Sequence, residues 1–140
     1  MRNATLFGLV LIAVTAGGCS NDASEVAKPT PAVVDTVAGS EQKQVTLTAD
    51  ASERISLKTG PVSAGSGTMT VMPYSAVIYD ADGLAWAYVS KGNNAFLREA
   101  LDIDRIEGDK AYLVSGPAVG KEVAIVGVAE LFGAETGIGK

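Results

Sequence analysis

Short segments in which apolar and polar residues alternate recur between residues 44 and 126, and they predict the fold class of this chain. In residues 44–49, Gln-Val-Thr-Leu-Thr-Ala, every second side chain is apolar, which is typical of a strand with one buried face. Comparable short strands are expected at 68–72, 74–79, 84–89, 95–101, 110–114 and 122–126. Residues 95–101 have a helix-forming composition, but we predict a strand there because hairpin turns lie on both sides.

Turn sequences separate these segments at regular intervals. Residues 80–83, Asp-Ala-Asp-Gly, are typical of a hairpin turn, because the glycine adopts a positive φ without steric cost. Further turns are expected at 91–94, 107–109 and 115–117. Turns spaced by roughly 8–12 residues between short strands indicate an all-β sandwich or barrel. We therefore predict a mainly β fold, a small antiparallel β barrel or sandwich with one short helix.

The one helix is expected directly after the first strand. Asp50 precedes Glu53 by three residues, a spacing similar to a capping box, so a helix of one or two turns should begin there. It should continue to Leu57, because residues 60–61, Gly-Pro, stop a helix. Trp86 lies in the middle of the strand expected at 84–89, with Leu84 and Tyr88 on the same face, so we expect it in the core. For Tyr88 the pattern leaves open a core position or a contact surface.

The first eighteen residues predict an export signal rather than part of the fold. The apolar run from residue 6 to residue 16 follows the single charge of Arg2 and has 11 residues. A bilayer core needs ~20 residues, so the run suits a secretory signal. The five residues 16–20, Ala-Gly-Gly-Cys-Ser, resemble the lipobox of bacterial lipoproteins, although Ala16 stands where leucine is usual. The resemblance implies that Cys19 is lipidated. The alternative is an ordinary secretory signal with an incidental cysteine.

The domain organisation follows from this signal and from the β region. We expect a signal peptide at 1–18, a flexible tether at 19–43 that is small, polar and interrupted by prolines, a β domain at 44–133 and a flexible tail at 134–140. The β domain should fold without the tether. A lipid on Cys19 would place the protein in the cell envelope, facing the periplasm, and the sequence does not decide between the inner and the outer membrane.

Composition removes most classes of function. The chain of 140 residues has 11 Lys and Arg against 16 Asp and Glu, a formal net charge of -5, which argues against nucleic-acid binding. It has no histidine and one cysteine. The commonest general base, every Ser-His or Cys-His nucleophile and every multi-thiolate metal site are therefore excluded. We expect no enzymatic activity and no cofactor.

Three pairs of side chains could in principle bind a cation. A pair in the 80–83 turn resembles part of a calcium loop but lacks its further ligands. An acidic pair two residues apart suits a solvated strand edge better, and two methionines without a histidine suit core packing better than copper. These pairs are Asp80 with Asp82, Asp102 with Asp104, and Met69 with Met72.

The order of short motifs from residue 71 onward resembles a known family. The motifs are VMPYSAVIYD (71–80), WAYV (86–89), Phe96, Arg98, Ile103, RIEGD (105–109), LVSG (113–116), GKEV (120–123) and GVAEL (127–131). Together they resemble the C-terminal part of periplasmic adaptor subunits, the membrane fusion proteins of tripartite efflux systems. In that family the membrane-proximal domain is assembled from both ends of the chain, and residues 45–62 look like the segment with which adaptors enter their folded body.

The resemblance implies a function and several contacts. An adaptor carries a lipoyl domain and usually a helical hairpin between these two pieces, whereas here only the loop 64–67 intervenes. The chain therefore resembles the two ends joined directly, and it could not bridge an envelope by itself. The family implies contact with an inner-membrane transporter or a full-length adaptor, and we consider Tyr74, Tyr88 and Arg98 as possible contact residues.

Two functions follow as expectations. The first is a membrane-anchored, non-enzymatic, adaptor-like module of a cell-envelope efflux or transport system. The alternative is a stand-alone periplasmic lipoprotein that binds a small ligand or a cation. An enzyme is the weakest possibility.

Overall fold

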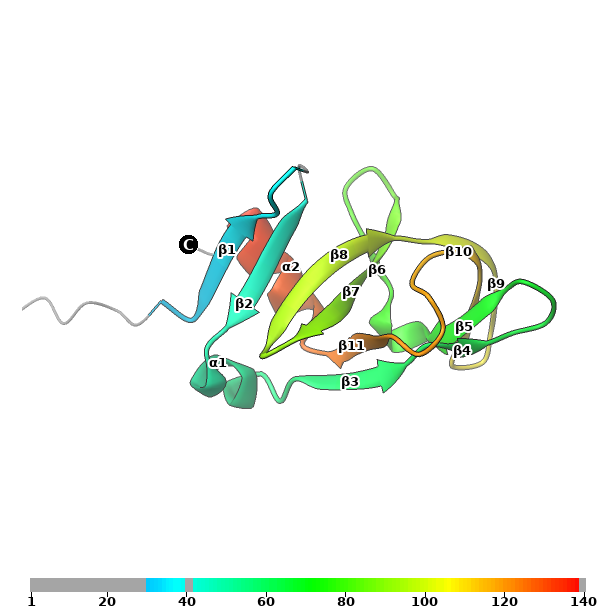
Figure 1. Cartoon of the computed structure of the whole chain (residues 1–140), viewed down its shortest axis with the longest axis horizontal. Helices are drawn as coiled ribbons and strands as arrows, with labels where there is room; N and C mark the ends of the chain where they lie inside the picture. Colours follow the sequence, from blue (N-terminus) through cyan, green and yellow to red (C-terminus); the bar gives the residue numbers. More distant parts are fainter. Residues whose placement is uncertain (1–29, 40–41, 139–140) are drawn as a thin grey trace, which may run out of the picture.

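Two antiparallel sheets contain the strands that the alternation predicts (Figure 1). The computed structural model describes residues 30–39 and 42–138, so the expected signal peptide and Cys19 lie outside the described residues. The mainly β prediction is confirmed, and the two sheets form a sandwich-like arrangement rather than a closed barrel. Both sheets are assembled from segments far apart in the sequence.

The larger sheet, sheet A, contains seven strands, and the smaller sheet, sheet B, contains four. The order in sheet A is β1 (Ala32–Thr36), β2 (Lys43–Leu47), β8 (Ala95–Ala100), β7 (Ala85–Gly92), β11 (Glu122–Val126) and β3 (Lys58–Pro61), with β6 (Ile78–Tyr79) paired to β7. The order in sheet B is β4 (Ser63–Ala64), β5 (Thr70–Pro73), β10 (Lys110–Ser115) and β9 (Asp102–Glu107).

The predicted turns and most of the predicted strands are present, but β3, β4 and β9 were not predicted. Residues 95–100 form β8, so context outweighs their helix-forming composition. Gly83 has a φ of +80° in the β6–β7 turn, and Asn93 and Asn94 also have positive φ in the β7–β8 turn. The expected strand at 74–79 differs: Tyr74–Ala76 form a short 3-10 helix, η1, before β6. Pro73 precedes it, and a proline has no N–H with which to extend a ladder.

The expected short helix is α1, Ala49–Arg54. Its N-cap is Thr48 rather than Asp50, two positions earlier than the capping-box spacing suggested, and the helix ends at Arg54 rather than at Leu57. The Thr48 Oγ1 atom accepts a hydrogen bond from the Ala51 N–H at 3.1 Å. Asp50 lies in the first turn, where a negative charge interacts favourably with the helix dipole.

The predicted tether is wrong for residues 32–36. These residues form β1, which pairs antiparallel with β2 so that Val34 lies opposite Val45. Val34 packs against the core cluster of which Val45 is part, while Val33 faces outward. The apolar pair in an otherwise polar stretch is therefore an edge strand of sheet A.

The predicted boundary at residue 133 is also wrong. The helix α2, Val128–Thr136, runs through it and packs against β1, β2 and β7 (Figure 1). Leu131 and Glu135, one turn apart, are both buried. Apolar residues at positions 128, 131 and 132 have helical spacing. This spacing indicates a helix, but none was predicted here because the preceding segments are strands.

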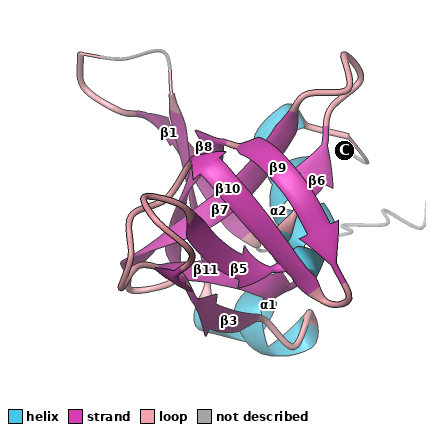
Figure 2. Ribbon diagram, turned by 90° about the vertical axis from the view of Figure 1, so that its right-hand side faces the viewer, coloured by secondary structure: helices cyan, strands magenta, loops and turns pink. Residues whose placement is uncertain are grey.

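Sheet A has a core on each face. Figure 2 shows β5, β9 and β10 of sheet B in front of β7 and β11, and the core between them contains Val62, Met72, Ala76, Ala87, Val89, Ala111, Leu113 and Val123. On the other face α1 and α2 cover a second core, which contains Val45, Leu47, Ala51, Tyr88, Phe96, Ala124, Val128 and Leu131.

The expectation that Trp86 lies in the core is wrong. Trp86 is only half-buried, whereas Tyr88, two residues further along the same face of β7, is fully buried. Trp86 lies near the end of β7, next to the β6–β7 turn, and an arginine side chain rather than a helix covers its ring. Alternation identified the correct face of β7 but not how far along it the helix extends.

Candidate functional site

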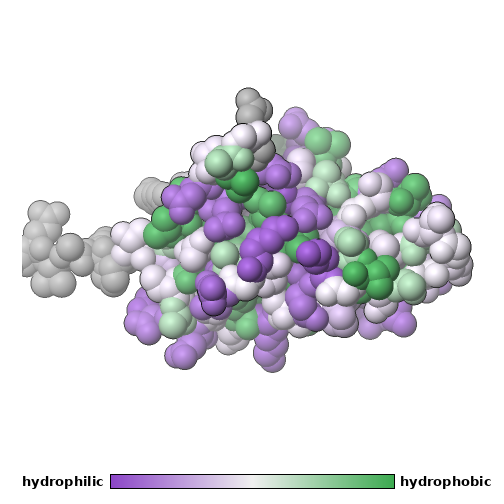
Figure 3. Space-filling model, viewed as in Figure 1, coloured by the Kyte–Doolittle hydropathy of each residue, from purple (hydrophilic) through white to green (hydrophobic). Residues whose placement is uncertain are grey.

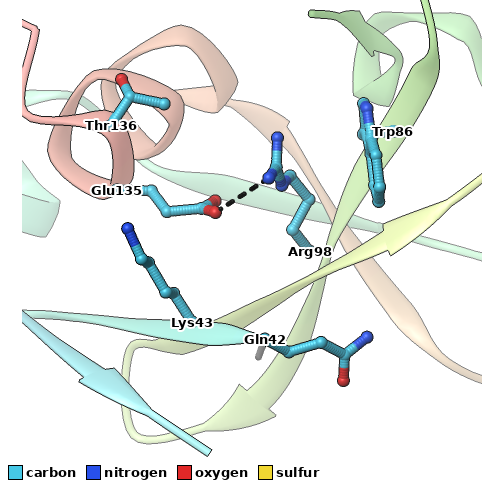
Figure 4. Close-up of a pocket in the computed structure, with 6 residues that line it drawn as sticks. All are labelled: Gln42, Lys43, Trp86, Arg98, Glu135 and Thr136. Atoms are coloured by element: carbon cyan, nitrogen blue, oxygen red, sulfur yellow. Dashed lines mark ion pairs between the residues drawn. The ribbon is translucent and has the colours of Figure 1, made fainter. Parts of the chain in front are cut away.

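A pocket of about 350 Å³ lies between the end of α2 and the face of sheet A that the helix covers (Figure 4). Its walls come from β2, β7, β8 and α2 and carry both charges and an aromatic ring. The lining residues are Gln42, Lys43, Trp86, Arg98, Glu135 and Thr136.

Strand register explains why side chains from three strands point into one pocket. Tyr88 and Arg98 are direct neighbours across β7 and β8, so their side chains share a face, and Trp86 shares it two residues away. Val45 lies opposite Phe96, which places Lys43 and Arg98, each two residues from this pair, on that same face. The helix α2, which covers this face of sheet A, forms the opposite wall of the pocket through Glu135 and Thr136.

Glu135 is held by two donors and is nearly inaccessible. Its Oε2 atom accepts a hydrogen bond from the Tyr88 hydroxyl at 2.6 Å. Its Oε1 atom lies 3.1 Å from the Nη2 atom of Arg98, and only 5% of its side chain is exposed. Burial and then the hydrogen bond to Glu135 raise the pKa of Tyr88 above its ordinary value. A carboxylate in such surroundings is tolerated because both oxygens have partners.

Arg98 is held between this carboxylate and two aromatic rings. Its guanidinium carbon lies 4.4 Å from the ring centroid of Trp86 and 5.7 Å from that of Phe132. These distances are those of cation–π contacts. The side chain remains 25% exposed, and Figure 4 shows the guanidinium between Glu135 and Trp86.

Asp80 fixes the orientation of Trp86 from the turn. The Trp86 Nε1 atom donates to Asp80 Oδ2 at 2.8 Å, and the amides of Asp82 and Leu84 donate to Asp80 Oδ1 at 3.0 and 2.9 Å. Desolvation acts to raise the pKa of Asp80, but these hydrogen bonds outweigh it and the pKa lies below its ordinary value. The turn interpretation of residues 80–83 is therefore confirmed.

Lys43 supplies the pocket's second cation. It is exposed at the start of β2, and within the described residues it forms no ion pair. The lining thus carries two cations, on Lys43 and Arg98, against the one carboxylate of Glu135. The carboxylate of Asp80, whose pKa the nearby charge of Arg98 helps to lower, also lies close to these cations.

The three residues considered for partner contact have different environments. Tyr74 is 38% exposed on η1, away from the pocket, and burial together with the nearby Tyr74 phenol raises the pKa of Tyr79. Tyr88 is completely buried, so its proposed role as a surface contact is wrong. Arg98 forms an ion pair with Glu135 of α2, and its side chain is 25% exposed. Lys43 and Glu135 were missed, and the helical spacing in α2 was the signal that could have indicated Glu135.

The other candidate cation ligands have structural roles. Met72 is buried in the core, as expected, while the Met69 sulfur lies 3.8 Å from the Nη1 atom of Arg105. Asp102 and Asp104 are exposed along β9, at the edge of sheet B, where Asp104 forms an ion pair with Arg105 at 2.8 Å. Across residues 30–39 and 42–138, no three His, Cys, Asp or Glu side chains gather as a metal site would require.

Among the described residues, no helix is both long enough and apolar enough to cross a bilayer. Comparison of the chain with models of protein families, with curated proteins and with solved structures finds no match.

Proposed function

We propose that this chain is a membrane-anchored, non-enzymatic, adaptor-like module that acts within an efflux or transport system of the cell envelope. The observation that carries the proposal is the order of strands in sheet A. Strands β2 and β3, from the first segment, lie on either side of β8, β7 and β11, from the second.

This interleaving supports the resemblance to the two joined ends of an efflux adaptor. Val45 of β2 pairs with Phe96 of β8, and Gly60 of β3 pairs with Val123 of β11, so neither segment forms sheet A without the other. Residues 65–69 connect β4 to β5 as a short hairpin, which closes the chain at the point where an adaptor would carry its further domains.

A pair of exposed tyrosines is the best candidate surface for the partner. Tyr74 and Tyr79 are 38% and 47% exposed and lie next to one another. Tyrosine is enriched in protein interfaces because it combines apolar area with a hydrogen-bonding hydroxyl. Figure 3 shows hydrophilic residues interspersed with small hydrophobic patches on one face of the molecule. We propose that the tyrosine pair contacts an inner-membrane transporter or a full-length adaptor.

Site-specific photocrosslinking in the native cells tests this contact. A photoreactive phenylalanine at position 79 should give an adduct with a membrane transport component. The matched control is the same residue at position 114, since Val114 is 60% exposed on β10 of sheet B. No adduct at position 79, or the same adduct from both positions, would contradict the proposal.

The anchor is tested separately. Cys19→Ser should convert a membrane-fraction protein into an unprocessed precursor or a soluble exported one, because the thiol that carries the lipid is gone. Fractionation of both proteins and mass spectrometry of the N-terminal peptide measure this. Identical fractionation, with no lipid mass on Cys19, would show that the protein is not a lipoprotein.

One observation favours the alternative of a stand-alone lipoprotein that binds a small ligand, namely the pocket between α2 and sheet A. Ligand binding without any adduct to a transport component would favour this alternative over the adaptor-like module.

A further inference from the structure

We infer that the free edge of β1 is an interface between two copies of this chain, which pair there and extend sheet A across a two-fold axis. The inference does not depend on the adaptor-like function. β1 is the outermost strand of sheet A, and among the described residues no strand pairs with its outer side (Figure 1). Such an edge presents backbone N–H and C=O groups that another strand can bind.

Three residues of β1 direct their backbone groups to this edge. The Thr48 N–H donates to the Pro31 C=O at 3.0 Å, so Pro31 bonds toward β2. In an antiparallel ladder the direction of these bonds alternates with each residue, and the pairing of β1 with β2 has no irregularity. Residues 33 and 35 therefore also bond toward β2. The N–H and C=O groups that point away from β2 are those of Ala32, Val34 and Thr36.

The other edges of the two sheets are protected, whereas that of β1 is not. Proteins block edge strands with charges, with prolines or by keeping the strand short. β3 carries Lys58 and Pro61, and β4 has only two residues. Charged residues make up most of β9, namely Asp102, Asp104, Arg105 and Glu107. β1 has five residues and one charge, on Asp35, and its Val33 side chain is 50% exposed.

A second copy of the chain fits this edge because β1 can pair with itself. An antiparallel pair centred on Val34 uses all five residues of the strand. Ala32 then lies opposite Thr36 of the second copy, so the residues with free backbone groups face one another and can exchange hydrogen bonds. Val33 lies opposite Asp35 of the second copy, so no two carboxylates are directly opposed. A contact of this symmetric kind is complete with two copies.

An apolar groove borders the same edge on the face that α2 covers. It has a volume of about 520 Å³ and lies between the start of β1 and α2. Small or apolar residues form most of its lining, namely Pro31, Ala32, Ala129, Gly133, Ala134 and Ile138. Ile138 is 71% exposed. Pairing centred on Val34 places Thr36 of the second copy beside Ala32, next to this groove, so association would bury apolar surface as well as pair the backbone.

Sedimentation equilibrium of the full chain, in detergent whose density the solvent matches, measures this association. We expect a concentration-dependent equilibrium between monomer and dimer. Thr36→Pro removes an N–H from the free edge but no hydrogen bond to β2, and proline is tolerated at such edge positions. It should weaken the dimer by roughly tenfold or more, as for the loss of two symmetry-related hydrogen bonds. A thermal melt of the dilute variant shows whether the monomer remains folded.

Two substitutions at Val33 test the pairing register without changing the backbone. Val33→Asp places a carboxylate opposite Asp35 of the second copy at two symmetric positions and should weaken the dimer roughly tenfold. Val33→Lys places a cation there and should strengthen the dimer severalfold at low ionic strength, a gain that salt should reduce. Val114→Asp is the control, because Val114 is 60% exposed on β10 of sheet B, and it should leave association unchanged.

The inference is overturned if the chain is monomeric at every concentration, if it forms assemblies larger than two, or if the two Val33 variants shift association in the same direction. A folded Thr36→Pro variant that associates as well as the wild type would also overturn it. If Thr36→Pro does not fold, the Val33 variants decide the test. A monomer whose position 33, carrying a photoreactive phenylalanine, crosslinks to a different protein in cells would assign the edge to that protein instead.

Discussion

Glu135 is the one charged residue that is buried in the part of the chain that the structure describes, and it joins α2 to two strands. Its oxygens accept from Tyr88 on β7 and lie against Arg98 on β8. A buried carboxylate is costly to desolvate. Removing one of its partners therefore destabilises the fold more than the intact ion pair stabilises it. Removal of any one of the three leaves a polar group without its partner.

Glu135→Ala should lower the free energy of unfolding by about 2–4 kcal/mol, because it leaves the Tyr88 hydroxyl buried without an acceptor and Arg98 without its counter-ion. Urea denaturation measures this. Glu130→Ala, at an exposed position of the same helix, should cost less than about 1 kcal/mol. Equal effects of the two variants would mean that the buried network does not secure α2.

Tyr88 should make stability depend on pH in the alkaline range. Its pKa in the folded protein is raised above the ordinary value of 10.0, first by burial and then by Glu135. As the pH rises past about 10, the unfolded chain loses this proton while the folded chain keeps it, so stability falls. Tyr88→Phe should flatten the decrease between about pH 9 and about pH 11. Tyr112→Phe, which also removes one phenol, is the control. An equal change in the pH dependence of stability in both variants would contradict the assignment of this effect to Tyr88.

At the level of elements, the β6–β7 hairpin is held by one side chain. Asp80 accepts from two backbone amides of its own turn and from the Trp86 indole on β7. The turn therefore fixes both the hairpin and the indole that forms one wall of the pocket. Asp82, in the same turn, is exposed, and its side chain makes no hydrogen bond with the described residues.

Asp80→Ala should lower the melting temperature more than Asp82→Ala does. It should also change the fluorescence of Trp86, because the indole loses its acceptor. Differential scanning fluorimetry with emission spectra measures both effects. Since the hydrogen bonds lower the pKa of Asp80 in the folded protein, the Asp80 contribution is present above the ordinary pKa and should be lost as the pH falls below it. Indistinguishable variants would show that the turn holds without this carboxylate.

The two helices differ in how far the sequence predicts them. Asp50 and Glu53 give a local signal for α1, which forms in the expected region but is capped by Thr48 and ends at Arg54. For α2, the apolar spacing covers little more than one turn, from residue 128 to residue 132. Packing of Leu131 against both sheet and helix residues then extends it to Thr136, because tertiary burial stabilises short helices more than propensity does.

At the scale of the whole molecule, β1 and α2 make the domain larger than the alternation predicted. The strand β1 adds an edge to sheet A, and α2 covers the face that β1 extends. Both lie at the ends of the described chain, and each contributes apolar residues to the same core cluster. The folding unit is therefore residues 30–138 rather than 44–133.

A fragment of residues 30–138 should melt cooperatively with a strand-dominated circular dichroism spectrum. The fragment 44–133 lacks β1, the first residue of β2 and Glu135, and it should be less stable by about 3 kcal/mol or more, the cost of losing the buried pair alone. Thermal melts of both fragments test this. Equal melting temperatures of the two fragments would show that residues 44–133 are the folding unit.

The sequence by itself determined the mainly β class, the turns, the central strands and the region of the short helix α1, because alternation, glycine in turns and helix capping act between residues close along the chain. It did not predict β1, β3, β4 or β9. Only the tertiary structure decided that β2 pairs with β8 and that Tyr88 rather than Trp86 is buried. It also decided that Glu135 meets Arg98 across 37 residues of sequence. A two-residue period states which side chains share a face of a strand, but it carries no information about which distant segment covers that face.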